Sequence, residues 1–159
     1  MMNTLKIGDL VPQFSLPDQD GEQVSSSDFI GQRLLIYFYP KSMTPGCTLQ
    51  ACGLRDNMDK FQKAKVEILG ISTDKPEKLY RFVEQELLNF NLLSDTNHEV
   101  CKKFGVWGEK SLMGKTYMGV YRMSFLIDEN GRVEQVFNNF QPSNHHNIIL
   151  DYLCITDKI

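Results

Sequence analysis

Two cysteines stand close together in a segment whose other residues suit nucleophilic chemistry. The segment is YPKSMTPGCTLQAC, residues 39–52, in which Pro45 and Gly46 precede Cys47. It follows an apolar run and opens a stretch with a helical pattern, so Cys47 is expected in the first turn of a helix. Free backbone N–H groups and the positive end of the helix dipole favour a thiolate there, and the thiolate is the reactive form of cysteine. Cys47 is therefore a candidate nucleophile.

Thr44 and Cys52 flank this candidate. The Thr44 hydroxyl can accept a hydrogen bond and donate another, so it could hold a thiolate and a substrate oxygen together. Cys52 lies five residues after Cys47, which on an intact helix separates the two Cα atoms by about 8–9 Å. A disulfide needs Cα atoms within about 7 Å. Either the two cysteines never pair, or the first helical turns unwind when they do.

The elements that must position these residues follow from the hydrophobic pattern. The apolar run at 33–39 predicts a central strand buried on both faces, which Pro40 ends. A helix is predicted from about residue 47 to residue 64, with Leu49 among its apolar face, and a second buried strand at 66–72. In an α/β sheet the segment after Pro40 lies at the carboxyl end of a strand, which is where ligands bind.

The remaining elements complete the expected fold. In chain order we expect short strands near 13–16 and 22–24, a capped helical turn ending near Gly31, a helix at 76–88, a strand at 91–93, a helix at 97–104 capped by Asn97, a Gly-rich loop at 105–119, a hairpin of strands 121–127 and 132–137, and a helix from Ser143 to about Cys154. This order predicts an α/β, three-layer domain with a central mixed sheet flanked by helices, and from the chain length we expect residues 1–159 to form one domain.

The composition of the chain excludes some classes of function. The 159 residues are 42% hydrophobic and 23% charged, and the net charge of -3 indicates no nucleic-acid-binding surface. No apolar stretch approaches the ~18 residues that cross a bilayer, and the N-terminus lacks the pattern of a secretion signal. We therefore expect a cytoplasmic protein without a membrane partner. In that reducing compartment, closely spaced cysteines point to catalysis or metal binding.

The same residues resemble a known family. Pro40, Thr44 and Cys47 match the peroxiredoxin signature Pro-x3-Thr-x2-Cys, and the run YPKSMTPGCTLQAC is similar to the peroxiredoxin Q subfamily, also called bacterioferritin comigratory protein. The stretches GISTDKPEKL, LLSD, FGVWGEKSLMGKTYMG and RMSFLID are similar to that subfamily as well. The resemblance covers essentially the whole chain and implies a thioredoxin-like fold, in agreement with the order of elements.

The resemblance implies a role for each of five residues. Cys47 resembles the peroxidatic cysteine, Thr44 the threonine that hydrogen-bonds the peroxide, and Pro40 the proline that shields the thiolate. Arg122, at the start of RMSFLID, resembles the arginine that pairs with the thiolate, and a fixed cation there would favour ionised sulfur. Cys52 resembles the intrachain resolving cysteine.

The reaction implied by the resemblance is the reduction of hydrogen peroxide and organic hydroperoxides in antioxidant defence. The Cys47 thiolate attacks the terminal peroxide oxygen, which releases water or an alcohol and leaves a sulfenic acid. Cys52 then condenses with the sulfenic acid to a disulfide, which a dithiol protein, by resemblance thioredoxin, reduces by exchange. The resemblance further implies a monomer that needs no metal, haem, flavin or other cofactor.

Other interpretations stay open at this level. Either cysteine could be a small buried packing residue, and Arg122 could be a surface charge on a hairpin. Zinc binding with Cys101 is disfavoured because the chain has no second closely spaced pair of ligands. A general thiol–disulfide exchange protein would share the fold, but such proteins usually carry Cys-x-x-Cys at the helix start, which is absent here. The pair His145–His146 is expected to be solvated near the start of the last helix.

Overall fold

The centre of the molecule is a mixed five-stranded sheet in the order β5-β4-β3-β8-β9. A computed structural model describes residues 4–157, with side chains described from residue 4 to residue 154. Strands β3, β4 and β5 run parallel, whereas β8 is antiparallel to both β3 and β9. The bounds of these strands are β3 Arg33–Phe38, β4 Val66–Ser72, β5 Asn91–Ser94, β8 Met123–Ile127 and β9 Val133–Phe137.

Strand β3 lies in the middle of the sheet because both of its faces are apolar. Side chains of a strand alternate between the two faces. Leu35 and Tyr37 pack into the core on one face, and Ile36 and Phe38 pack into a second core on the other. The predicted central strand, buried on both faces, is confirmed.

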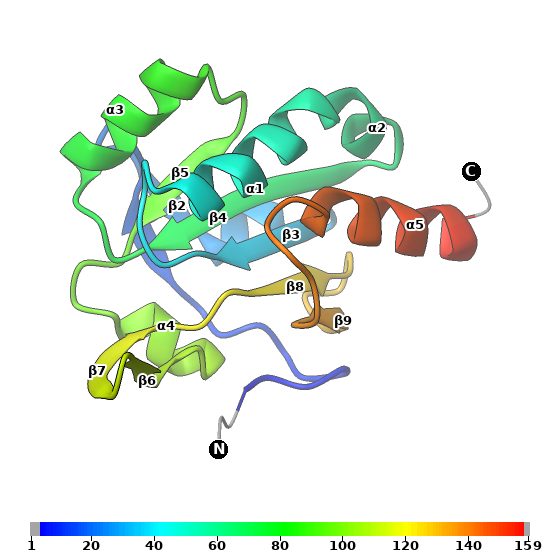
Figure 1. Cartoon of the computed structure of the whole chain (residues 1–159). Coiled ribbons are helices and arrows are strands. Elements are labelled where there is room, and N and C mark those ends of the chain that lie inside the picture. Colours follow the sequence, from blue (N-terminus) through cyan, green and yellow to red (C-terminus); the bar gives the residue numbers. More distant parts are fainter. Residues whose placement is uncertain (1–3, 158–159) are drawn as a thin grey trace.

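The helices form layers on the two faces, as Figure 1 shows. Helices α1, α2, α3 and α5 cover the face of Tyr37, whereas α4, the N-terminal hairpin and its 3-10 turn lie on the face of Phe38. The predicted three-layer α/β fold is therefore confirmed. The bounds are α1 Pro45–Asp56, α2 Met58–Lys63, α3 Pro76–Glu86, α4 Glu99–Phe104, α5 His145–Asp157, β1 Ser15–Pro17, β2 Gln23–Ser25 and the 3-10 turn η1 Ser26–Phe29.

The structure has two helices where one was predicted over 47–64, because the helical conformation is interrupted at Asn57. The Asn57 side chain donates a hydrogen bond to the carbonyl oxygen of Gly53 at 2.8 Å, which competes with the backbone ladder of the helix. Its φ and ψ of -115° and 16° end α1 and begin α2. The prediction that Leu49 belongs to the apolar face is also wrong, since 56% of Leu49 is exposed.

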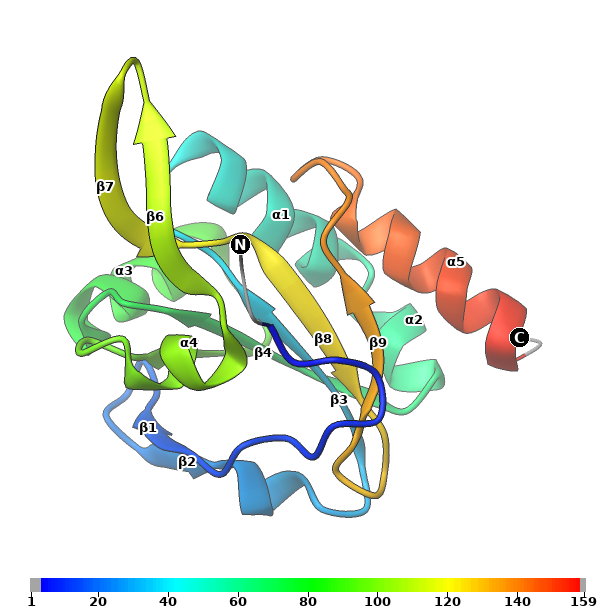
Figure 2. The same cartoon turned by 90° about the horizontal axis from the view of Figure 1, so that it is seen from below.

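The segment 105–119, predicted to be a loop, contains an antiparallel hairpin. Strands β6 (Trp107–Leu112) and β7 (Lys115–Val120) are joined by Met113 and Gly114, whose φ angles of 52° and 81° suit a two-residue hairpin turn. Figure 2 shows the hairpin projecting beyond the sheet on the side where α1 begins. Gly108 and Gly119 lie opposite each other across the hairpin. Because they have no side chains, the sequence does not show the alternation of apolar and polar residues that marks a strand.

Smaller differences concern helix ends. Helix α4 begins at Glu99, and its first N–H groups are capped by Asp95, whose carboxylate oxygens accept from Val100 and Cys101 at 3.2 and 2.8 Å. The expected cap, Asn97, accepts only a weaker bond of 3.4 Å from Glu99. The other predicted strands and helices are present within a few residues of their expected bounds. Within the described part of the chain, helices are too short or too polar to cross a membrane.

Candidate active site

The turn between β3 and α1 brings Cys47 to a helix start. Strand β3 ends at Phe38, Thr44 precedes the helix in an extended conformation, and Pro45 begins α1. Proline suits this place because its fixed φ matches the helix and its missing N–H has no partner there. Met43 adopts a left-handed φ of 66°, which turns the loop into the helix. Cys47 therefore lies in the first turn, as predicted.

The loop is held by contacts that sequence reasoning did not find. The backbone N–H of Ser42 donates to the Asp74 carboxylate at 2.7 Å, and the Ser42 and Tyr39 hydroxyls lie 3.0 Å apart. Asp74 follows strand β4, so the carboxyl ends of two neighbouring parallel strands are tied together at the site. Burial raises the pKa of Tyr39, which keeps this phenol neutral.

Arg122 reaches the Cys47 thiol from the segment just before β8. Only 1% of Cys47 is exposed, and its Sγ lies 3.5 Å from Arg122 Nη2. Gly46 lies beside the same nitrogen, since a Cβ there would be in ordinary contact with it at 3.4 Å. The structure thus brings together two residues that are 75 positions apart in the sequence. The guanidinium therefore contacts the sulfur directly and can donate a hydrogen bond to it.

Gln50 holds the other side of the guanidinium. Its Oε1 accepts a hydrogen bond from Arg122 Nη1 at 2.6 Å, and its side chain is fully buried on α1. Gln50 lies one helical turn after Cys47, so the nucleophile and the group that orients Arg122 share a helix face. The sequence reasoning missed Gln50, although its polar side chain on an otherwise apolar helix face was a usable signal.

Thr44 and Pro40 border the same loop, both half-buried. The Thr44 hydroxyl donates to the carbonyl oxygen of Lys41 at 2.7 Å and does not cap the helix. Because a hydroxyl has one proton and two lone pairs, this bond leaves Thr44 free to accept a hydrogen bond from a bound molecule.

Cys52 lies on α1 as well, but it faces another helix. Its Sγ donates to the Glu86 carboxylate on α3 at 3.5 Å, and both Cys47 and Cys52 are free thiols. Burial raises the pKa of the Cys52 thiol, and the hydrogen bond to Glu86 raises it further. The two cysteines are not brought together, as the helix geometry predicts for an unbroken α1.

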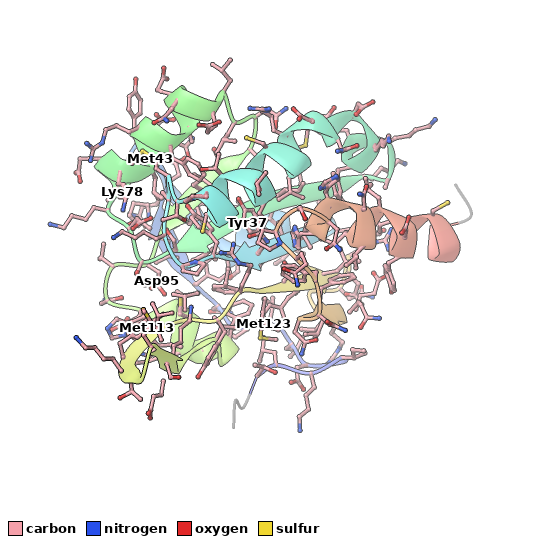
Figure 3. All side chains as sticks on the ribbon, viewed as in Figure 1. Tyr37, Met43, Lys78, Asp95, Met113 and Met123 are labelled. Carbon is pink, nitrogen blue, oxygen red and sulfur yellow. The ribbon has the colours of Figure 1, made fainter. Side chains whose placement is uncertain are left out.

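A cluster of three buried polar side chains lies beneath α1. Tyr37 on β3 pairs with Ser124 on β8, and His145 Nε2 lies 2.6 Å from Ser124 Oγ. Figure 3 shows Tyr37 between the sheet and the helical layer. Burial raises the pKa of Tyr37 and lowers that of His145 to about 3, so both side chains are neutral. The expectation that His145 is solvated is wrong, because the start of α5 packs onto the sheet; His146 is half-buried against Gly53.

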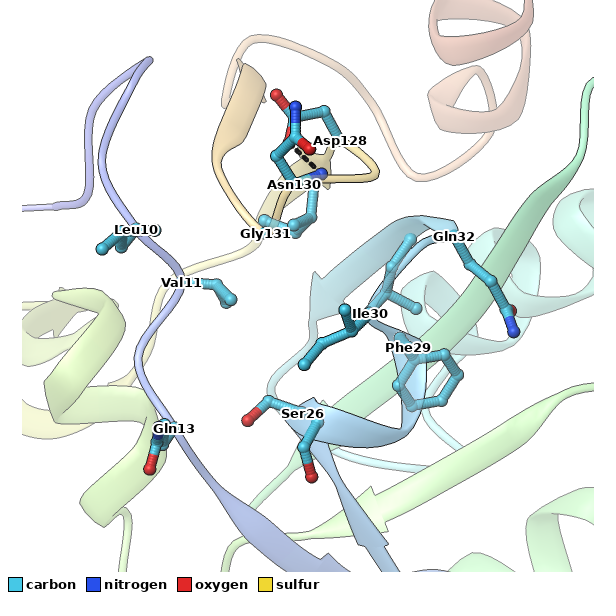
Figure 4. A pocket seen from close by; sticks show the side chains of 13 residues that line it. Leu10, Val11, Gln13, Ser26, Phe29, Ile30, Gln32, Asp128, Asn130 and Gly131 are labelled. Carbon is cyan, nitrogen blue, oxygen red and sulfur yellow. Dashed lines mark hydrogen bonds between the residues drawn. The ribbon is translucent and has the colours of Figure 1, made fainter.

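An apolar pocket lies elsewhere on the molecule. Figure 4 shows Leu10, Val11, Phe29 and Ile30 among its lining side chains, near the turn at Asp128. Its walls belong to the face of the sheet opposite to Cys47. Among the described side chains, three or more His, Cys, Asp or Glu residues are nowhere grouped as a metal site.

Known proteins resemble this chain over most of its length. Residues 7–136 match the AhpC/TSA family. The chain is 69% identical over 152 residues to Peroxiredoxin Bcp of Escherichia coli K12, which covers 96% of this chain and 97% of that protein. It is 53% identical to the putative peroxiredoxin bcp of Haemophilus influenzae, with 96% and 98% covered.

Solved structures with the same fold include two close matches. A mutant of Xylella fastidiosa PrxQ superposes with a TM-score of 0.90 at 26% identity, covering 96% of this chain and 98% of that one. The bacterioferritin comigratory protein of Xanthomonas campestris, described for its alkyl peroxide reduction activity, superposes with a TM-score of 0.86 at 30% identity, covering 96% and 97%.

Proposed function

Since the chain belongs to the AhpC/TSA family and is a peroxiredoxin, a thiol peroxidase, we propose that Cys47 is its peroxidatic cysteine and Arg122 the cation that activates it. The observation that carries this proposal is the 3.5 Å separation between Cys47 Sγ and Arg122 Nη2 at the start of α1. A helix N-terminus and a neighbouring guanidinium are both features of the environment that makes a cysteine nucleophilic.

In the first step, the Cys47 thiolate attacks the terminal oxygen of the hydroperoxide. The S–O bond forms as the O–O bond breaks, which leaves a sulfenic acid on Cys47 and releases water or an alcohol after protonation of the leaving oxygen. Arg122 and the backbone N–H groups of the first turn stabilise the charge that develops along the O–O bond. Thr44 accepts a hydrogen bond from the peroxide, and Pro40 helps to exclude water.

In the second step, Cys52 resolves the sulfenic acid. The Cys52 sulfur displaces the hydroxyl group from the Cys47 sulfur, so a disulfide and a water molecule form. Both residues lie within the continuous helix α1, and Cys52 is bonded to Glu86. The step therefore requires the first turns of α1 to open and Cys52 to leave Glu86.

The reductant proposed is thioredoxin or a similar dithiol protein, which returns both cysteines to thiols by exchange. The proposed substrates are hydrogen peroxide and organic hydroperoxides, a choice supported by the alkyl peroxide reduction described for the Xanthomonas campestris protein. We also propose that the protein works in the cytoplasm, since recycling by a dithiol protein needs a reducing compartment. A monomer is proposed on the resemblance to the peroxiredoxin Q subfamily alone.

The test is a peroxide-driven NADPH oxidation assay with thioredoxin and its reductase. Cys47→Ser should abolish turnover, whereas Cys52→Ser should react once with peroxide and then recycle poorly. Cys154→Ser, at an exposed position on α5, serves as the matched control and should keep wild-type turnover. Near-wild-type turnover in Cys47→Ser would overturn the assignment of the nucleophile, and unchanged recycling in Cys52→Ser would overturn that of the resolving residue.

A further inference from the structure

The base of the β6–β7 hairpin is joined to the start of α4 by a pair of stacked rings. The centroids of the His98 and Trp107 rings lie 4.1 Å apart, and the ring planes are within 4° of parallel. His98 is the residue before α4, and Trp107 is the first residue of β6. Figures 1 and 2 both show α4 beside this end of the hairpin. Both side chains are half-buried, so the stack is part of the packing between the helix and the hairpin.

The backbone of His98 has a conformation that a residue other than glycine seldom adopts. Its φ and ψ of 51° and 23° are left-handed. Such a conformation is strained for a residue with a Cβ and persists where the surroundings fix it. The Nδ1 atom of the ring is buried without a hydrogen-bond partner among the described residues. No hydrogen bond at Nδ1 therefore orients the ring in that part of the chain, and the stack on Trp107 is the contact that accounts for its orientation.

Trp107 is in turn connected to Arg122 through the base of the hairpin. In the antiparallel register Trp107 pairs with Val120, which lies two positions before Arg122. Between these two positions, the backbone N–H of Tyr121 donates to the carbonyl oxygen of Val106 at 2.7 Å. Val106 and Val120 are both buried. The base of the hairpin therefore fixes the backbone on the N-terminal side of Arg122, while β8, which begins at the next residue, fixes the other side.

We propose that His98 is a positioning residue of the peroxidase site, which acts through Trp107 and the base of the hairpin to hold Arg122 against Cys47. This inference rests on the proposed roles of Cys47 and Arg122. The guanidinium lies 3.5 Å from Cys47 Sγ, whereas residues 111–118 of the hairpin are exposed. Exposed segments with few packing contacts fluctuate, so a contact at the base of the hairpin limits how much of that motion reaches Arg122. His98 does this without touching the substrate.

The test is the rate at which hydrogen peroxide oxidises Cys47 in the reduced full-length protein, measured by rapid mixing, quenching and mass spectrometry. His98→Asn removes the ring and keeps a residue type that adopts the left-handed backbone, and His98→Ala is a second variant without a ring. Both should react about three- to tenfold more slowly than wild type. His98→Phe provides a ring that can stack and should recover the wild-type rate. Asn97→Ala, at the exposed neighbouring position, is the matched control and should keep that rate.

Two further measurements separate a positioning role from a general loss of structure. Trp107 is the single tryptophan of the chain, so its fluorescence reports on the stack. The emission should shift to longer wavelengths in His98→Asn and return in His98→Phe. In an Arg122→Gln background, which has already lost the guanidinium, His98→Asn should slow the reaction by less than about twofold.

A wild-type rate in both His98→Asn and His98→Ala would overturn the proposal, as would an unchanged emission in His98→Asn or a slow reaction in His98→Phe. An undiminished loss from His98→Asn in the Arg122→Gln background would also overturn it, because His98 would then act by a route other than Arg122. A wild-type rate in Arg122→Gln alone would instead overturn the proposed role of Arg122, so the two failures are distinguishable.

Discussion

The Cys52 thiol donates a hydrogen bond to the Glu86 carboxylate across the gap between α1 and α3, with 3.5 Å between Sγ and Oε1. This contact directs Cys52 away from Cys47, although the two share one helix. Burial and the neighbouring carboxylate both raise the pKa of the thiol. Glu86 therefore keeps the proposed resolving cysteine protonated, and less reactive, while α1 is intact.

Replacing Glu86 should speed the second step. We expect Glu86→Gln to lower the pKa of Cys52 and to accelerate disulfide formation at pH 7 about threefold, because more of the thiol is ionised. Rapid mixing of reduced protein with one equivalent of peroxide, with quenching and thiol counting, measures this rate. Glu84→Gln is the control, since it removes a charge from an exposed position of the same helix. Equal rates in Glu86→Gln and wild type would contradict the prediction.

Oxidation should open the start of α1. In the reduced protein the Thr48 N–H bonds to the Thr44 carbonyl oxygen at 2.9 Å, so the first turn is closed. A disulfide between Cys47 and Cys52 needs their Cα atoms to be closer together than a regular helix allows. Hydrogen exchange of the α1 amides should therefore be faster in peroxide-treated wild type than in reduced protein. Peroxide-treated Cys52→Ser should stay protected, and equal protection in both forms of wild type would rule out the opening.

Gln50 should affect peroxidase activity because it orients Arg122. We expect Gln50→Met, which keeps the length of the side chain and removes its acceptor, to lower kcat/KM for peroxide about tenfold, because the guanidinium loses its 2.6 Å bond and its orientation. Gln50→Glu should retain most of the activity, since a carboxylate also accepts from a guanidinium. Steady-state kinetics give both values, and thermal unfolding checks that each variant is folded. Wild-type kcat/KM in Gln50→Met would show that Arg122 needs no support.

His145 should make the fold sensitive to mild acid. Burial lowers its pKa in the folded protein to about 3 from the ordinary 6.5, so the unfolded chain binds a proton that the folded protein does not. The stabilisation is complete above pH 6.5 and is lost as the pH falls toward 3. At pH 5 the loss attributable to His145 should be about 2 kcal/mol. Urea unfolding at pH 7 and pH 5 measures it, and His145→Gln should lose less stability between these pH values than wild type. An equal loss in both proteins would contradict the prediction.

Local pattern was sufficient for the parts of this protein that depend on neighbouring residues. The apolar run at 33–39 predicted a buried strand, and the turn through Pro45 and Gly46 into a helix placed Cys47 at the helix start. The distance along a helix also predicted that Cys47 and Cys52 stay apart while α1 is regular. These conclusions needed no tertiary contact, because periodicity, turn residues and helix geometry act over a few residues.

The hairpin and the start of the last helix were misjudged because the packing of distant side chains is not visible in the local pattern. Gly108 and Gly119 carry no side chain and therefore erase the alternation that marks a strand. Gly108 leaves room for the Tyr121 side chain, which a Cβ there would approach to 2.7 Å. His145 looked polar and therefore exposed, yet the start of α5 covers Tyr37 and Ser124 and buries it. A side chain's hydrophobicity sets a preference for burial, and packing decides the outcome.

The sequence by itself determined the α/β order of elements, the helix start and the candidate nucleophile. Only the tertiary structure decided what surrounds that nucleophile. Arg122 comes from a segment 75 residues away, and Glu86 holds Cys52 from another helix. Such contacts depend on how the sheet and its layers pack, since residues distant in the chain meet only when the whole core is assembled.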